Sequence, residues 1–480
     1  MSQSIGPYST ATEMLTALRA RKVSSVELVE MHVKRINERD GALNAIPIRT
    51  ADRARDAARL ADAALARGQR APLLGLPMTL KESTQTAGLP QTAGIVAFKD
   101  YRPAGDGPLA SAVFSAGACL LGKTNIPVAL ADWQADSPIY GRTNNPWDLT
   151  RTPGGSTGGG GAALAAGLTP LEIGSDIGGS IRVPGAYCGV YGHRPSETAI
   201  PRAGVFPLAD LPNPAAVMGV QGPLARSAED LELLFDVLAG PVLGEDVAWK
   251  LVLPEARHAA LKDFRVAVMP PMPWVKPASE MQGKVDALAT FLSQRGAKVA
   301  QAMPTLDYES YFRDYLTLLT VATAQGQTRA EREAMARANK DGGALAAQAE
   351  GLTLDAAGYL ALMNRRESAR HVWRSFFRDW DVLIGPMTLD AAFPHQTEGD
   401  FASRTLLIDN ERVPYLLNIV YPMWAIFAGQ PSTAFPAGLN RAGLPLGLQA
   451  IGPYLEDKTT LRFAQLLERE WQGFQPPPGY

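Results

Sequence analysis

Short apolar runs alternate with segments of helical character beyond residue 75, and this alternation constrains the fold more than any other feature of the chain. The apolar runs have the length of buried strands, and the stretches between them have the spacing of short helices. Strands that alternate with helices form a sheet with helices packed on it, so the sequence predicts an α/β fold. The expected strands are 76–80, 118–121 and 168–173, and the expected helices are 109–116 and 159–166.

The same pattern returns in the second half of the chain. The span 306–380 is mostly helical and polar in character and carries no chemical motif. Because expected strands flank it at 297–301 and 381–385, we interpret it as a helical excursion from one large domain. No internal repeat or low-complexity linker divides the 480 residues. The other expected elements are helices within 9–68, a strand at 264–269, a helix at 279–295, strands at 432–437 and 446–451, and a final helix at 457–470.

Composition narrows the class of protein. Lys and Arg total 46 against 48 Asp and Glu, a net charge of −2 that gives no electrostatic reason to expect nucleic acid or an anionic membrane as a partner. No apolar run approaches the about 18 residues needed to span a bilayer, and the N-terminus lacks the pattern of a signal peptide. Cys119 and Cys188 have no CxxC spacing, which supports neither a disulfide framework nor a zinc site. We therefore expect a soluble cytoplasmic protein without a metal.

Residues 117–124, Gly-Ala-Cys-Leu-Leu-Gly-Lys-Thr, match the phosphate-binding loop pattern letter for letter. That pattern needs a strand before the first glycine and a helix after the lysine. Here the interior residues 118–121 are themselves the expected strand, and Pro127 falls where the helix would begin its second turn. We therefore reject nucleotide binding.

Two glycine-rich segments have the character of an active site. Residues 153–161 hold six glycines in nine residues around Ser156, and glycines at this density allow close backbone approach. Residues 174–182 follow an expected strand and can direct several backbone N–H groups at one point, an arrangement that stabilises an oxyanion. Ser180 directly follows those glycines. Taken alone, each segment is better interpreted as a plain turn.

A serine nucleophile needs a base, and histidine is the usual one. Of the five histidines only His193 is near either segment, and nothing in its surroundings marks it as a catalytic base. Lys81, at the end of an expected strand, can serve if burial lowers its pKa. A lysine extending to solvent from the strand end is the alternative reading.

The combined motifs resemble those of the amidase signature family over nearly the whole chain. The two serines stand 24 residues apart, as in that family. The matching motifs are Gly-Leu-Pro at 75–77 with Lys81, Gly-Lys-Thr-Asn at 122–125, Asn-Pro-Trp-Asp at 145–148, Pro-Gly-Gly-Ser at 153–156, Gly-Ser-Asp-Ile-Gly-Gly-Ser-Ile-Arg at 174–182, and Gly-Leu-Pro-Leu-Gly-Leu-Gln at 443–449.

The resemblance implies a single large α/β domain over 1–480, with a central mixed β-sheet covered by helices on both faces. Within it, residues 1–70 would be N-terminal helices, 71–200 the catalytic core, about 306–380 the helical excursion, and 381–480 a return to the sheet. The implied activity is amide hydrolysis of a small molecule, without a cofactor or metal. Esters, carbamates and a homodimer are compatible with it.

The resemblance also implies roles for single residues. Ser180 would be the acylated nucleophile, Ser156 would relay its proton from a cis peptide bond after Gly155, and Lys81 would be the neutral base. The N–H groups of Ile177, Gly178 and Gly179 would form the oxyanion hole. Thr157, Asp176 and Arg182 would support the site, and Leu130 and Trp133 would line the substrate pocket.

Some positions depart from the family pattern. Thr157 stands where a second serine is usual, Glu82-Ser83 where Asp-Asn is usual, and His193-Arg194 where Leu-Lys is commoner. These departures remove no proposed catalytic group, and they leave the preferred acyl and amine groups open.

Two alternatives remain. One is the A subunit of a glutamyl-tRNA amidotransferase, of the same family and similar length. That subunit typically has Thr and Gln where this chain has Ile177 and Val183, residues that resemble stand-alone amidases. The other is a binding protein without catalysis, against which the joint presence of Lys81, Ser156 and Ser180 argues.

Overall fold

A computed structural model describes residues 5–208, 211, 214–338, 343–399 and 401–480. Over these residues the chain folds around one sheet of eleven strands, in the order β1-β3-β2-β6-β8-β7-β14-β15-β11-β9-β10. The strands are β1 (Ile48–Arg49), β2 (Pro77–Lys81), β3 (Cys119–Thr124), β6 (Leu171–Asp176), β7 (Tyr191–Arg194), β8 (Val220–Ala225), β9 (Arg265–Val268), β10 (Lys298–Gln301), β11 (Val382–Pro386), β14 (Ser432–Leu439) and β15 (Pro445–Ile451).

The sheet is mixed, as the sequence predicted. Strands β3, β2 and β6 are parallel to one another, and so are β11, β9 and β10. Between these two groups, β8, β7, β14 and β15 pair antiparallel. Two short hairpins lie outside the sheet, β4 (Asp136–Ser137) with β5 (Gly141–Arg142) and β12 (Thr405–Ile408) with β13 (Glu411–Pro414).

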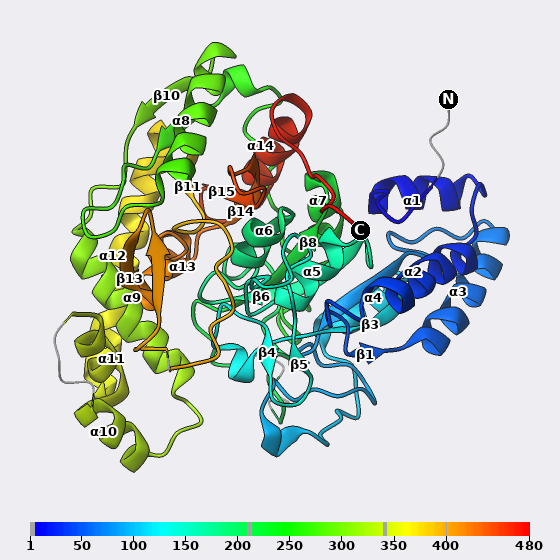
Figure 1. Cartoon of the computed structure of the whole chain (residues 1–480), viewed down its shortest axis with the longest axis horizontal. Helices are drawn as coiled ribbons and strands as arrows, with labels where there is room; N and C mark the ends of the chain where they lie inside the picture. The colour runs from blue at the N-terminus through cyan, green and yellow to red at the C-terminus, as the bar shows by residue number, and fades with distance from the viewer. Residues whose placement is uncertain (1–4, 209–210, 212–213, 339–342, 400) are drawn as a thin grey trace.

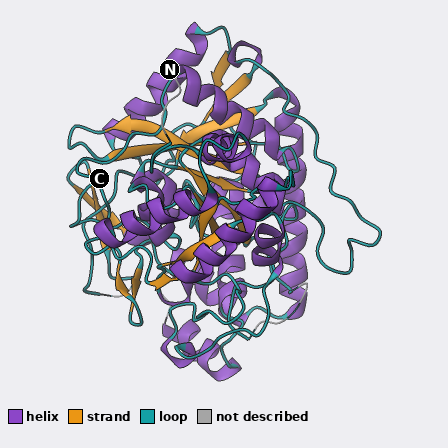
Figure 2. Ribbon diagram, turned by 90° about the vertical axis from the view of Figure 1, so that its right-hand side faces the viewer, coloured by secondary structure: helices purple, strands orange, loops and turns teal. Residues whose placement is uncertain are grey.

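Helices cover both faces of the sheet, and Figure 2 shows the strands enclosed by them. On β3, Leu120 belongs to the main hydrophobic core together with residues of α4 and α7. Cys119 and Leu121 lie on the opposite face of the strand from Leu120 and pack in a second core with residues of α2, α3 and α5. The helices are α1 (Ala11–Arg19), α2 (Ser25–Arg39), α3 (Ala51–Ala66), α4 (Pro108–Ser115), α5 (Gly158–Ala165), α6 (Arg182–Cys188), α7 (Ala228–Leu238), α8 (Ser279–Gln294), α9 (Tyr308–Thr323), α10 (Arg329–Ala338), α11 (Gly343–Thr353), α12 (Ala356–Asp379), α13 (Met423–Ala428) and α14 (Asp457–Glu470).

Local signals explain several helix boundaries. Ser24 accepts a hydrogen bond from the backbone of Glu27, whose side chain bonds back to Ser24, so the capping box predicted there is present at the start of α2.

Helices α9 to α12 occupy most of the span 306–380 and lie at the opposite end of the molecule from α1 to α3 (Figure 1). The C-terminal tail returns to the N-terminal helices, where the Gly479 carbonyl accepts a hydrogen bond from Arg39.

The rejection of a phosphate-binding loop at 117–124 is confirmed. Residues Cys119–Thr124 form strand β3, so no glycine-rich loop wraps an anion there. Lys123 is buried within this strand, and its ammonium donates to the carbonyl of Pro90.

Candidate active site

Lys81 is the last residue of β2, and its side chain is 1% exposed. Its Nζ lies 2.7 Å from Ser156 Oγ and 2.9 Å from Ser175 Oγ. The residue therefore does not extend to solvent, which was the alternative reading of the sequence. Hydrogen bonds to these two hydroxyls hold the amine, and Lys81 has no ion pair among the described residues.

Burial lowers the pKa of Lys81 to about 7, because removing an ammonium from water disfavours its charged form. The carboxyl groups of Glu172, Asp176 and Glu82 oppose this shift. A large fraction of Lys81 is thus a free amine near neutral pH, the state that a general base requires.

Ser156 lies in the glycine-rich turn before α5. The peptide bond between Gly155 and Ser156 is cis, as the family resemblance implied. Gly155 is required by close backbone contact, because a Cβ there would come within 2.3 Å of the Asp132 carbonyl oxygen. The turn is thereby pressed against the segment before Trp133, and Ser156 is held next to Lys81.

Ser180 lies in the loop between β6 and α6, and the Asp176 side chain organises this loop. The Asp176 carboxylate accepts from the N–H groups of Gly179 and Ile181 and from the Arg182 guanidinium. Burial alone would raise the pKa of Asp176, but Arg182 and Arg194 hold it below its usual value. Asp176 and Arg182 thus contact the loop that carries Ser180, and their supporting role stays a prediction.

The two serine segments are joined through the backbone, where the Thr157 N–H donates to the Ser180 carbonyl at 3.1 Å. Sequence analysis expected the Thr157 hydroxyl to act in support. Instead, the buried Thr157 Oγ1 has no hydrogen-bond partner among the residues that the structure describes. The contact of Thr157 with the Ser180 segment is thus made by its backbone, and its supporting role stays a prediction.

One of the three N–H groups expected to form the oxyanion hole has a hydrogen-bond acceptor within the protein. The Gly179 N–H donates to Asp176 Oδ1 at 2.9 Å and is therefore already engaged. Within the described parts of the chain, no acceptor takes the N–H of Ile177, Gly178 or Ser180. The structure thus leaves two of the three expected donors free, because the buried Asp176 carboxylate takes the third. Ser180 supplies a further free N–H in the same loop.

Two aromatic side chains fix the orientation of these peptide groups. The Tyr315 hydroxyl donates to the Ile177 carbonyl at 3.0 Å, and the Trp133 indole N–H donates to the Gly178 carbonyl at 2.9 Å. Because a peptide unit is planar, holding the Ile177 carbonyl also holds the N–H of Gly178. Sequence analysis missed Tyr315, which lies in the helical span without a motif, and it missed Ser175.

The two residues expected in the substrate pocket have different surroundings. Trp133 is 4% exposed and packs against Phe401 and Tyr415, with ring centroids 5.3 and 5.2 Å away. Leu130 is half-buried, with a left-handed backbone at φ 58°. Trp133 therefore contacts the Ser180 loop through its indole N–H, and the pocket role of both residues stays a prediction.

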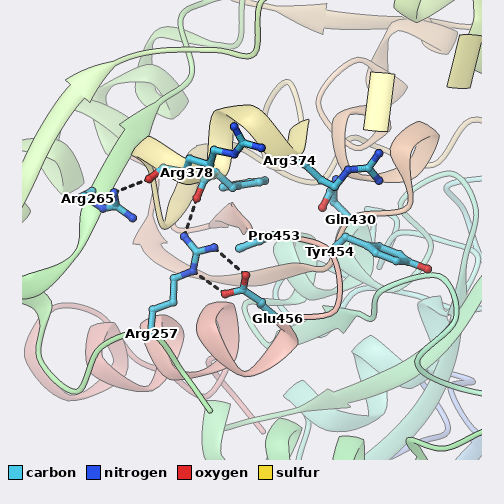
Figure 3. A pocket seen from close by; sticks show the side chains of 9 residues that line it. Arg257, Arg265, Arg374, Arg378, Gln430, Pro453, Tyr454 and Glu456 are labelled. Atoms are coloured by element: carbon cyan, nitrogen blue, oxygen red, sulfur yellow. Dashed lines mark hydrogen bonds and ion pairs between the residues drawn. The ribbon is translucent and has the colours of Figure 1, made fainter. Parts of the chain in front are cut away.

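One cleft of the molecule is lined by none of Lys81, Ser156 and Ser180. It has a volume of about 520 Å³, and Figure 3 shows its lining. Arg257 is bound by Glu456 and Arg265 by Asp381, so both arginines already have carboxylate partners. The lining residues are Arg257, Arg265, Arg374, Phe377, Arg378, Gln430, Pro453, Tyr454 and Glu456.

The described residues contain no group of three or more His, Cys, Asp and Glu side chains that could hold a metal ion. In the same residues, no helix is both long enough and apolar enough to cross a bilayer.

A family model described as Amidase matches residues 27–461. The chain is 32% identical to the A subunit of glutamyl-tRNA(Gln) amidotransferase from Anaeromyxobacter sp. (strain K), over 96% of this chain and 95% of that protein. It is 33% identical to a putative amidase, AmiB2, of Mycobacterium tuberculosis (strain CDC 1551 / Oshkosh), over 94% of each chain. The solved structure of 6-aminohexanoate cyclic dimer hydrolase superposes with a TM-score of 0.79 at 25% identity, over 99% of each chain.

Proposed function

The chain belongs to the amidase family, and on that premise we propose that it is an amidohydrolase that cleaves C–N amide bonds through Lys81, Ser156 and Ser180. The observation that carries this proposal is the buried contact of 2.7 Å between Lys81 Nζ and Ser156 Oγ. It joins an amine of lowered pKa to a hydroxyl on the segment that also contacts Ser180. The acidic product is a carboxylic acid, and the other product is an amine or ammonia.

In the acylation step, Ser180 Oγ attacks the amide carbonyl carbon. Its proton passes to Ser156 Oγ as the Ser156 proton passes to neutral Lys81, so Lys81 becomes an ammonium. The carbonyl oxygen gains negative charge, which the free N–H groups of Ile177, Gly178 and Ser180 can stabilise by hydrogen bonds. Return of the proton through Ser156 to the leaving nitrogen breaks the C–N bond and leaves an ester on Ser180.

In the deacylation step, water replaces the amine. Lys81 takes a proton from water through Ser156, and the hydroxide attacks the ester carbonyl. Collapse of this intermediate returns the proton to Ser180 Oγ and releases the acid. Ester and carbamate bonds fit the same sequence of steps, since each presents a carbonyl carbon to the nucleophile.

For the substrate we propose a chemical class and leave its acyl and amine groups open. We propose a small-molecule amide, a cytoplasmic location and no nucleic-acid or membrane partner, with the near-balanced charge of −2 as support. A homodimer is compatible with this proposal.

A second candidate is the A subunit of a glutamyl-tRNA amidotransferase, favoured by the 32% identity to such a protein over 96% of this chain. Ile177 and Val183 favour the stand-alone enzyme. Both candidates use the same serine chemistry, and they differ in whether the lone chain is complete.

The test is a hydrolysis screen of the purified chain against aryl anilides, primary amides, esters and carbamates, with amine release as the readout for amides. Turnover by the lone chain, lost in Ser180→Ala, supports the stand-alone amidohydrolase. Turnover only after addition of partner subunits supports the amidotransferase candidate. Turnover that persists in Ser180→Ala contradicts both.

A further inference from the structure

Glu172 is a fully buried carboxyl group close to the catalytic base. It lies on β6 opposite Thr79 of β2, and Lys81 follows Thr79 by two residues on the same strand. Because side chains alternate along a strand, Thr79 and Lys81 project from the same face of the sheet as Glu172. The Thr79 hydroxyl donates to Glu172 Oε2, and the Thr124 hydroxyl donates to Oε1 at 2.7 Å.

Helix α5 covers this carboxyl group from above the sheet. A Cβ at Gly160 would come within 2.6 Å of Glu172 Cγ and 3.0 Å of Oε1, so glycine is needed for the helix to close over the acid. Ser156 precedes the same helix by two residues. The helix that follows the relay serine is therefore also the one that excludes water from Glu172.

Of the three acids near Lys81, only Asp176 has an ion pair among the described residues, whereas Glu172 and Glu82 accept hydrogen bonds from uncharged donors. Asp176 is paired with Arg182, and Glu82 accepts from Tyr140 and from the backbone of Thr92. Glu172 has only its two hydroxyl donors and, within the described residues, no ion pair. Burial raises its pKa to about 8, and Lys81 is the cation that acts against this shift. Conversely, Glu172 is the carboxyl group that most strongly opposes the lowering of the Lys81 pKa.

We propose that Glu172 is a positioning residue that sets the basicity of Lys81, an inference that rests on the proposed role of Lys81 as the base. While Glu172 is protonated, Lys81 is a free amine and accepts the Ser156 proton. When Glu172 is ionised, its negative charge stabilises the ammonium that Lys81 becomes during acylation. The two groups therefore titrate as a coupled pair.

The test is the pH profile of Glu172→Gln, which keeps the shape of the side chain and removes its charge. A negative charge can only favour the ammonium form of Lys81, so its loss moves the midpoint of kcat/KM to lower pH. We expect a shift of up to about one pH unit, the lower end for a nearby charge, because Glu172 with its raised pKa is ionised in only part of the molecules at this pH. The kcat plateau should also fall by a few-fold up to about tenfold, because the ammonium is less stabilised.

Glu468→Gln is the matched control. Glu468 is a half-buried acid, with a pKa raised to about 7, and it accepts from the Ala228 N–H in the layer of α7 and α14. Its substitution should leave the midpoint of kcat/KM unchanged. A general effect of removing a carboxyl of raised pKa from the protein would change both variants alike.

Should Glu172→Gln fail to fold, Thr124→Val supplies a second variant. It removes one donor to the Glu172 carboxylate, favours the protonated acid and should lower the midpoint by a smaller amount. An unchanged or raised midpoint in either folded variant overturns the role of Glu172. A wild-type profile without an ionisation that depends on Lys81 overturns the proposed function instead.

Discussion

Lys81 and His193 are both buried bases in hydrogen-bonding contact with a hydroxyl group, yet their surroundings differ. His193 Nδ1 lies 2.9 Å from Thr433 Oγ1, and its Nε2 lies 3.2 Å from Asp457 Oδ1. This hydroxyl, imidazole and carboxylate have the composition of a serine-protease triad. We refer to them as the His193 cluster.

Every member of the His193 cluster is already engaged. The Thr433 hydroxyl donates to Thr460, and Asp457 accepts from both the backbone and the hydroxyl of Ser196. Around Lys81, by contrast, the neighbouring loop leaves the N–H groups of Ile177 and Gly178 unbonded. Unbonded N–H donors therefore distinguish the proposed catalytic site from a buried cluster whose polar groups are all hydrogen-bonded to one another.

The largest expected effect on activity distinguishes the hydroxyl of Ser180 from that of Thr433. Ser180→Ala should lower kcat/KM for an amide by at least about 10³-fold, because no other group can form the acyl ester. Thr433→Ala is its control and should keep activity within a few-fold. Steady-state kinetics on both folded variants checks this. Comparable losses of activity in the two variants would contradict the assignment of Ser180 as the nucleophile.

The next comparison is between the two bases. Lys81→Met keeps the length of the side chain and removes the amine, so it should cost at least about 10²-fold in amide turnover. Esters should suffer less, because an alkoxide leaves with less need of a proton. His193→Gln should retain most of the activity. If Lys81→Met kept near-full amidase activity, the assignment of the base would fail.

The pH dependence of kcat/KM also distinguishes Lys81 from His193 as the base. The pKa of Lys81 is lowered to about 7 by burial, so the active free amine is lost as pH falls below that value. We expect kcat/KM to rise with pH through about 7, by tenfold per unit on the acidic side, and then to level off. The profile of His193→Gln should be unchanged, and a step that disappears in this variant would transfer the ionisation to histidine.

The two substitutions should have the opposite order of effects on stability, with His193→Gln destabilising the protein more than Lys81→Met. His193→Gln disturbs buried hydrogen bonds to Thr433 and Asp457 and should lower the free energy of unfolding by about 1–3 kcal/mol. Lys81→Met removes a buried amine whose charged form is disfavoured, so the free energy of unfolding should stay level or increase. Urea denaturation at neutral pH compares the two, and a larger loss in Lys81→Met would contradict the division between stability and function.

Much of the fold follows from local pattern in the sequence. The final helix, expected at 457–470, is present as α14, and the strands expected at 264–269 and 381–385 are present as β9 and β11. Strand β6 begins at Leu171, three residues later than expected. Pro170 lacks an N–H and restricts the residue before it, which delays the strand.

Strand β8 escaped the sequence analysis because Gly222 and Pro223 lie within it, and both weaken a strand pattern. Pairing with β6 on one side and β7 on the other makes this segment a strand. Its identity is therefore fixed by tertiary contacts that no local window of sequence contains.

The sequence proposed candidate residues for the site but could not specify the contacts that the structure gives them. Lys81, Ser156 and Ser180 were proposed from the family resemblance, since each glycine-serine segment alone fits a plain turn. Tyr315 reaches the Ile177 carbonyl from 138 residues away, so no spacing rule could reveal it. The engagement of the Gly179 N–H by Asp176 depends on a side-chain rotamer, which the motif does not specify.

The most direct test of the central claim is the position of a covalent label. A fluorophosphonate probe, which reacts with activated serines, should modify the wild-type protein at Ser180, as read by mass spectrometry of its peptides. Labelling should be much slower in Lys81→Met and unchanged in His193→Gln, because only Lys81 activates the nucleophile. A label at Thr433 or any residue other than Ser180, or equal labelling in Lys81→Met, would contradict the account.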